Sequence, residues 1–318
     1  METRVTYIHP CYEIKNFSFK FTTTPSAVCV MLYSFLTLLS VATVCGNLLV
    51  IISVLYFKQL HTPTNSLILS LAVADLLVGI ILFPLTIAFS FSFCMYHEDL
   101  LCKIKDSFGV YLCTCSILHL CCISIDRYYA VCQPLTYKSK ISRHVVVIMI
   151  TVSWSASALI GIGITQKSKQ QCQETCFIDV IGNTIGPVLS FYLPLVIMLC
   201  IYLKIFLVAQ RQARSIQARM KCGATVSKME RKATKTLAIV LGVFIFCCTP
   251  SFFCYTFLPF TNSLVPVPLI ESLVCLTLTN STLNPFIYAF FYSWFRSAFR
   301  MIMSGKILHG EFANTKLY

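Results

Sequence analysis

The sequence predicts an all-α membrane protein, a seven-transmembrane helix bundle with a short amphipathic eighth helix. Hydrophobic residues make up 57% of the 318 residues and charged residues only 12%, which suits a bilayer better than the core of a water-soluble protein. A run of roughly 18 residues without a charged side chain is long enough to cross the hydrocarbon as a helix. Seven such runs appear, and Asp75 alone interrupts the second: 27–57, 65–96, 107–125, 145–166, 180–203, 236–258 and 272–295.

These runs form one domain with two short flanks. We expect an extracellular N-terminal segment at 1–26, the seven-helix domain at 27–295, and an amphipathic helix with a short cytoplasmic tail at 296–318. Aromatic and basic side chains alternate over residues 294–301, as in a helix that lies in the membrane interface. No internal repeat or low-complexity linker indicates a second domain.

The distribution of charge predicts the orientation of the bundle. With the N-terminus outside, eighteen of the 25 Lys and Arg residues lie on the cytoplasmic side, as the positive-inside rule requires. We therefore expect a multi-pass plasma-membrane protein in contact with membrane lipid. The net charge of +13 reflects this topology and does not indicate nucleic-acid binding. A sequon at Asn16 lies in the outer segment and predicts glycosylation.

The 18 cysteines belong to two groups. Most lie inside the apolar runs, where cysteine is a small packing residue. Cys11, Cys102, Cys172 and Cys176 instead lie on the predicted outer face, where oxidising conditions permit two disulfides. A zinc site at Cys172 and Cys176 is the competing interpretation, but no pair of histidines joins them on that side. We therefore favour the disulfides.

Four motifs occupy defined places in these runs. Asp126 to Tyr128 (DRY) closes the third run, and Asn284 to Tyr288 (NPFIY) lies near the end of the seventh. Gly46-Asn47 lies in the first run, and Leu71 to Asp75 (LAVAD) lies in the second. With all four in register, the sequence resembles the rhodopsin-like, class A, G-protein-coupled receptors from about residue 27 to 304.

The seventh run resembles one subgroup of these receptors. The letters NSTLNP from Asn280, then Tyr288, then YSWF from Tyr292, are similar to the fingerprint of the trace amine-associated receptors. The resemblance implies a receptor, not an enzyme, whose ligand is a small-molecule odorant and often an amine. It also implies an olfactory role, a stimulatory heterotrimeric G protein with cyclic AMP as messenger, and the disulfides Cys102–Cys176 and Cys11–Cys172.

Arg127 is the centre of the expected signalling machinery. It carries a permanent charge at the inner membrane edge, where Asp126 and Glu230 are its expected partners. Release of this pairing would let the sixth helix swing outward, with the Tyr202 and Tyr288 hydroxyls free to meet Arg127. Three further residues are expected to relay motion from the outer pocket to the inner half, and ordinary core packing is the competing interpretation of them. The predicted G-protein switch is Asp126, Arg127, Tyr128, Tyr202, Glu230, Asn284, Pro285 and Tyr288, and the predicted relay is Ile117, Pro194 and Phe244.

Asp75 is the acid deep inside a predicted span, where an unpaired charge is costly and usually functional. The resemblance implies an allosteric sodium ion here, and the matching side chains all carry oxygen, which suits a small hard cation. A hydrogen-bonded structural aspartate is the competing interpretation, and we expect no other cofactor. The predicted sodium residues are Asp75, Ser116, Asn280, Ser281 and Asn284.

The outer half departs from the family pattern. Amine receptors carry an aspartate on the third helix where this chain has Gly109, and the alternative position on the fifth helix is Gly186. Cys248 replaces a tryptophan on the pocket floor, so we expect altered basal activity. Asp106 or Glu271 is left to hold an amine in a shallower pocket, or a ligand without a strong cation binds by shape and aromatic contact. The residues for that contact are Val110, Cys113, Phe252 and Tyr255.

Other functional classes fit less well. A retinal receptor needs a lysine in the seventh run, which has none, and a transporter usually carries several charges at depth. A decoy or non-signalling relic stays an alternative because the amine anchors and the tryptophan are absent. The retained DRY and NPFIY motifs favour a working receptor instead.

Overall fold

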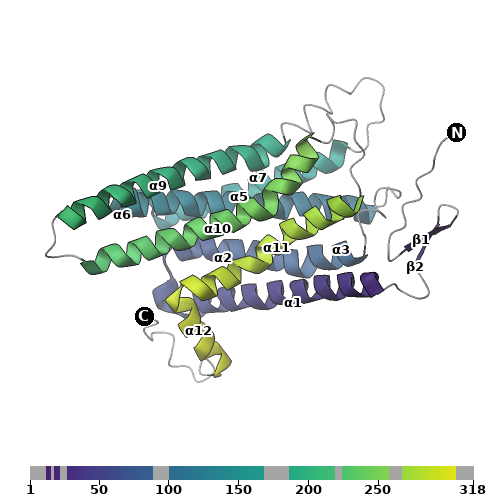
Figure 1. Cartoon of the computed structure of the whole chain (residues 1–318), viewed down its shortest axis with the longest axis horizontal. Helices are drawn as coiled ribbons and strands as arrows, with labels where there is room; N and C mark the ends of the chain where they lie inside the picture. The colour runs from purple at the N-terminus through teal and green to yellow at the C-terminus, as the bar shows by residue number, and fades with distance from the viewer. Residues whose placement is uncertain are drawn as a thin grey trace.

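The computed structural model describes residues 12–15, 18–21, 27–88, 100–167, 186–218, 224–257 and 267–305. Seven long helical segments lie side by side in an elongated bundle (Figure 1). The segments are α1 (Ala27–Tyr56), α2 with α3 (Pro63–Leu77 and Phe83–Ala88, joined by a π-helical turn at Val78–Leu82), α5 (Leu100–Cys132), α7 (Arg143–Lys167), α9 (Leu193–Ala218, preceded by a π-helical turn at Val188–Tyr192), α10 (Ala224–Phe257) and α11 (Val267–Phe291).

Shorter elements flank the bundle. A 3-10 turn (Lys58–Leu60) and α6 (Pro134–Lys140) follow α1 and α5. At the same end of the bundle, α12 (Ser293–Met303) turns away from the helix axes (Figure 1). The strands β1 (Tyr12–Lys15) and β2 (Ser18–Phe21) pair antiparallel at the opposite end.

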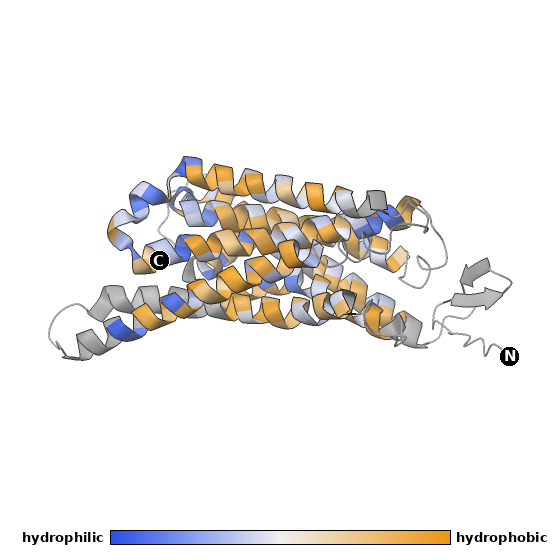
Figure 2. Ribbon diagram, turned by 90° about the horizontal axis from the view of Figure 1, so that it is seen from above, coloured by the Kyte–Doolittle hydropathy of each residue, from blue (hydrophilic) through white to orange (hydrophobic). Residues whose placement is uncertain are grey.

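The helices carry the apolar length that a membrane requires. Within the described residues, five segments are long and apolar enough to cross a bilayer, and α10 holds a shorter apolar stretch at Ile239–Cys254. Hydrophobic residues dominate the middle of the helices and hydrophilic ones gather toward the ends (Figure 2). Within the described residues, each of the seven predicted runs overlaps one long helical segment.

Helix ends differ from the ends of the charge-free runs. The third run was predicted at 107–125, whereas α5 extends from Leu100 to Cys132. Lys105 and Arg127 lie inside this helix, because a helix end near the membrane surface tolerates charge. The end of the seventh run differs as well. The backbone of Tyr292 is extended (φ −99°, ψ 116°), so α11 ends before it and α12 begins at Ser293.

A proline follows each π-helical turn. Pro84 and Pro194 each lie two residues after such a turn. Proline has no backbone N–H, and its ring clashes with the carbonyl four residues earlier. A wider turn before the ring relieves this clash without ending the helix. Pro250 and Pro285 lie inside α10 and α11 without ending them.

Close packing joins α1 to α11. A Cβ atom on Gly46 would lie 2.9 Å from the ring carbons of Pro285, so glycine is needed for this approach. The Asn47 amide donates to the carbonyl of Ser281 at 3.2 Å, and the hydroxyls of Thr43 and Thr282 are 2.6 Å apart. These contacts hold the two helices together near the middle of the bundle.

His119 joins three helices as a buried core residue. Its Nε2 lies 2.7 Å from the Ser70 hydroxyl, and its Nδ1 lies 2.7 Å from the carbonyl of Cys115. The indole N–H of Trp154 on α7 donates to the same Ser70 hydroxyl at 2.9 Å. Both ring nitrogens of His119 thus have partners, which agrees with a packing role.

Candidate functional site

Asp126 and Arg127 form an ion pair at the inner end of α5. The Asp126 carboxylate is buried, and Arg127 donates to it through Nε at 2.9 Å and Nη2 at 2.5 Å. Thr64 at the start of α2 donates at 2.7 Å, and Tyr137 on α6 donates at 2.9 Å. Arg127 also donates to the Thr64 hydroxyl. A buried carboxylate is costly unless donors surround it, and here donors from three elements do so.

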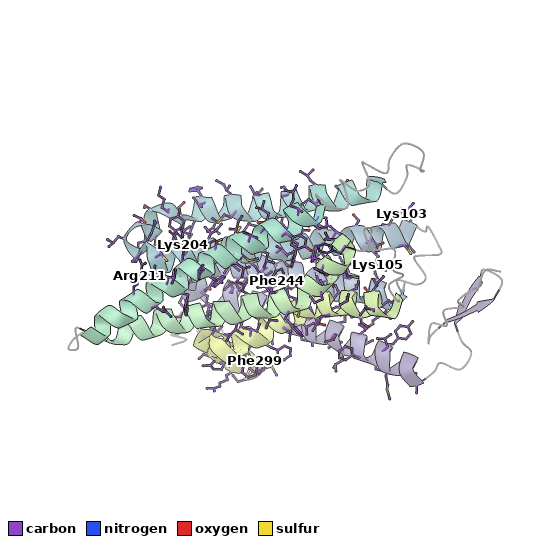
Figure 3. All side chains as sticks on the ribbon, turned by 45° about the horizontal axis from the view of Figure 1, so that its top comes forward. Lys103, Lys105, Lys204, Arg211, Phe244 and Phe299 are labelled. Carbon is purple, nitrogen blue, oxygen red and sulfur yellow. The ribbon has the colours of Figure 1, made fainter. Side chains whose placement is uncertain are left out.

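The Tyr137 phenol is suited to stay a donor in this network. Burial raises the pKa of Tyr137, and the nearby Asp126 carboxylate raises it further. The proton therefore stays on the phenol, which donates to Asp126. Lys204 and Arg211 lie toward the same end of the bundle (Figure 3). Glu230, the second expected partner of Arg127, belongs to α10, but its side chain lies outside the described residues.

The tyrosines of the predicted switch are held inside the bundle. Tyr288 is buried, and its ring meets that of Tyr292 edge-on at a centroid distance of 5.9 Å. Tyr202 on α9 and Ser124 on α5 line the same cavity, which has a volume of about 10 Å³ and lies between α5, α9 and α10. Tyr128 packs edge-on against Tyr129 at 5.6 Å.

Asp75 on α2 is fully buried and faces α5 and α11. Its carboxylate accepts hydrogen bonds from Asn284 Nδ2 at 2.8 Å and from Ser116 Oγ at 3.3 Å. The Oδ1 atoms of Asn280 and Asn284 are buried without a hydrogen-bond partner. Buried amide oxygens without partners are uncommon, and with Asp75 they offer oxygen ligands that fit a small cation.

One small cavity connects the sodium residues to the predicted ligand residues. Its volume is about 20 Å³, room for about one water-sized species. Gly109, Cys113 and Cys248 of the ligand set and Ser116, Asn280 and Ser281 of the sodium set line it, together with Val78, Leu82, Phe244, Thr277 and Leu278.

The predicted ligand residues differ in how open their surroundings are. A Cβ on Gly109 or Gly186 would meet no atom within 4 Å, so both positions are open. Asp106 is 58% exposed, and its Oδ1 lies 3.8 Å from Lys105 Nζ. Glu271 and Val110 are half-buried, and the side chain of Tyr255 lies outside the described residues.

The predicted relay residues are all buried. Ile117 and Phe244 belong to one apolar cluster, and Pro194 is buried at the start of α9. Phe191, in the π-helical turn, lies between Phe244 (6.0 Å) and Phe252, on which it stacks at 4.1 Å. This aromatic row passes from the predicted ligand residue Phe252 to the relay.

The outer covalent features are described in part. Cys102 is buried at the start of α5 and is disulfide-bonded. Cys11, Cys172 and Cys176 lie outside the described residues, as does Asn16. The pairings Cys102–Cys176 and Cys11–Cys172 and the glycan therefore stay predictions.

The structure adds residues that the sequence did not single out. Thr64 and Tyr137 hold Asp126, and their only signal is that each lies near a proline that begins a helix. Phe191 had no signal in the apolar run. Lys105 is a charge beside the predicted ligand residues, a signal that was available. Arg296 donates to the carbonyls of Ala289 (3.1 Å) and Phe290 (2.9 Å) at the end of α11.

Comparison with known proteins bears on all of these sites. The family model described as 7 transmembrane receptor (rhodopsin family) matches residues 46–288. Trace amine-associated receptor 1 of Macaca mulatta is 42% identical, covering 97% of this chain and 98% of the relative. The human receptor of the same name is 41% identical, with 97% of each chain covered. Trace amine-associated receptor 4 of Mus musculus is 37% identical over 97% of this chain and 95% of the relative.

These matches confirm the seven-helix fold class and the predicted resemblance. The chain is a multi-pass membrane receptor with a G protein and a small-molecule ligand as partners, and the prediction that it is not an enzyme is confirmed. It belongs to the trace amine-associated receptors of the rhodopsin family.

Proposed function

We propose that the receptor lies in the plasma membrane with its N-terminus outside and detects amines or related small odorants. It signals through a stimulatory G protein and cyclic AMP. The positive-inside rule supports the orientation, because most Lys and Arg residues lie toward the Arg127 end. The names of the relatives support an amine ligand. The olfactory role and the stimulatory class rest on the family resemblance alone.

The observation that carries this proposal is the Asp126 network. Arg127 is 21% exposed on its side chain, while Asp126 is fully buried. In this state the guanidinium is turned to Asp126 and not to a partner protein. Movement of α10 and release of Arg127 would present a positive group to a G protein at the basic end of the bundle. A signalling receptor needs such a held inactive state, whereas a non-signalling relic has no need of it.

The counterion for an amine is the open part of the proposal. Asp106 is 58% exposed, so solvent screens its charge. Glu271 is half-buried on α11 and is the better anchor. A ligand without a strong cation is the second candidate, because Gly109 leaves open space and most of the cavity lining is apolar.

A sodium ion belongs to the same proposal. The buried Asp75 carboxylate, its donor Ser116 and the unsatisfied oxygens of Asn280 and Asn284 support it. A bound cation would neutralise Asp75 and favour the inactive arrangement. Ser281, which lines the adjoining cavity, completes the predicted set.

A cyclic-AMP reporter assay in transfected cells tests the function. We expect the wild type to respond to members of an amine library. Tyr137→Phe removes one donor from Asp126, which costs the held state about 1.5–3 kcal/mol, so basal cyclic AMP should rise severalfold. Tyr129→Phe, near the same helix end, is the matched control and should leave basal cyclic AMP unchanged.

Two results would count against the proposal. Responses only to neutral odorants would point to the non-amine receptor. No response to any compound, together with equal basal cyclic AMP in Tyr137→Phe and wild type, would support the non-signalling relic.

A further inference from the structure

Lys105 is a buried cation beside the predicted ligand residues. The residue is only 9% exposed, although lysine is almost never fully buried without a compensating charge. Lys105 and Lys103 lie at one end of the bundle, opposite Lys204 and Arg211 (Figure 3). Lys105 also lies one helical turn before Gly109, on the helix face that lines the cavity further down. Its ammonium group is thus part of the approach to the cavity.

Two carboxylates among the described residues act on this ammonium group, and they differ in exposure. Asp106 lies 3.8 Å away but is 58% exposed, so much of its charge stays in solvent. Glu271 on α11 also attracts Lys105 electrostatically and is half-buried. Leu278, two turns after Glu271 on the same helix face, lines the cavity. Among the described residues, the approach to the cavity therefore carries the positive group of Lys105 and the negative group of Glu271.

Resting on the proposed function as a small-molecule receptor, we propose that the ligand is zwitterionic. Its carboxylate binds Lys105, its ammonium group binds Glu271, and its apolar part points toward Gly109 and the cavity. An amino acid with an apolar side chain has this chemistry.

Charge complementarity gives the reason. A simple amine at Glu271 meets the like charge of Lys105, and a simple acid at Lys105 meets the like charge of Glu271. A zwitterion replaces the attraction between the two side chains with two new ion pairs. Lys105 and Glu271 then each have a counterion from the ligand. A buried charge without a counterion would be costly in an apolar site.

Matched compounds of different charge test the inference. Phenylalanine, phenethylamine and 3-phenylpropionate share one apolar group, and leucine, 3-methylbutylamine and 4-methylpentanoate share another. Thermal unfolding of the purified full-length receptor in lipid nanodiscs reports binding of each compound without a G protein. We expect at least one amino acid to bind about tenfold or more tightly than its amine and its acid. A preference for the amines or the acids, or binding of none of the six compounds, overturns the inference.

Variants assign the effect to Lys105. Lys105→Met should abolish the preference for the amino acid over the amine, whereas Lys105→Arg should keep it. Lys103→Met removes a nearby lysine outside the proposed site and should behave as wild type. Glu271→Gln should weaken amino acid and amine binding but not acid binding. Equal preferences in Lys105→Met and Lys103→Met would overturn the role of Lys105.

The binding assay separates this inference from the proposed signalling function. Zwitterion binding without a cyclic-AMP response would count against stimulatory coupling and leave the ligand class standing. A cyclic-AMP response to amines with no zwitterion preference in binding would do the reverse.

Discussion

Asp75 and Asp126 are both fully buried, yet their carboxylates are satisfied to different degrees. Asp126 accepts hydrogen bonds from Arg127, Thr64 and Tyr137, and Arg127 neutralises its charge. Asp75 accepts from Asn284 and Ser116, which are both neutral. Its negative charge therefore has no cationic partner among the described side chains that bond it, and that difference is the physical basis for a bound cation.

Replacement of Asp75 by Asn tests this difference. Sodium chloride should raise the thermal unfolding midpoint of the wild-type receptor by several degrees relative to choline chloride, because sodium binds the folded state. In Asp75→Asn this increment should vanish, since the amide carries no charge. Asp106→Asn, an exposed carboxylate, should keep it. A sodium increment of equal size in Asp75→Asn and wild type would remove Asp75 as the site.

At the scale of an element, α12 depends on how it joins α11. Its sequence places Trp294, Phe295 and Ala298 on the buried side and Phe299 and Arg300 on the exposed side. The helix begins one residue after the extended Tyr292, so the carbonyls at the end of α11 would lack partners. Arg296 folds back and donates to two of them. A single side chain thus caps one helix while it belongs to the next.

Removal of this cap should loosen the junction. In Arg296→Met the hydrogen bonds to the carbonyls of Ala289 and Phe290 are lost, and charged hydrogen bonds contribute about 1.5–3 kcal/mol. Amide hydrogen exchange over residues 289–295, followed by mass spectrometry, should speed up about tenfold or more. Arg300→Met, an exposed arginine on the same helix, is the matched control. Equal exchange in the two variants would show that the cap contributes nothing.

At the scale of the whole molecule, the orientation of the bundle is open to direct test. We place an epitope tag before Met1 in one version of the receptor and after Tyr318 in another. Antibody should label the N-terminal tag on intact cells, and it should label the C-terminal tag only after permeabilisation, because the basic end faces the cytoplasm. The opposite labelling pattern would reverse the orientation and place Arg127 outside the cell.

The sequence allowed the fold to be predicted better than the site. Charge-free runs located all seven helical segments because a membrane span must be apolar along its length. They missed the ends of α5, because the charged residues Asp106 and Asp126 that end the run lie within the helix. The motifs located Asp126 and Asp75, but not Thr64 as a partner of Asp126, since that contact joins residues 62 positions apart. The burial of Lys105 likewise depends on packing between helices, which no local pattern records.

The close approach of Gly46 to Pro285 has a consequence for motion. Because a methyl group at Gly46 would already overlap the proline ring, no adaptable side chain lies between α1 and α11 at this point. We expect the two helices to behave as a fixed frame, with the Pro285 region of α11 held against α1. The displacement that signalling requires then has to occur on the far side of the bundle, where α9 and α10 extend beyond the other helices (Figure 1).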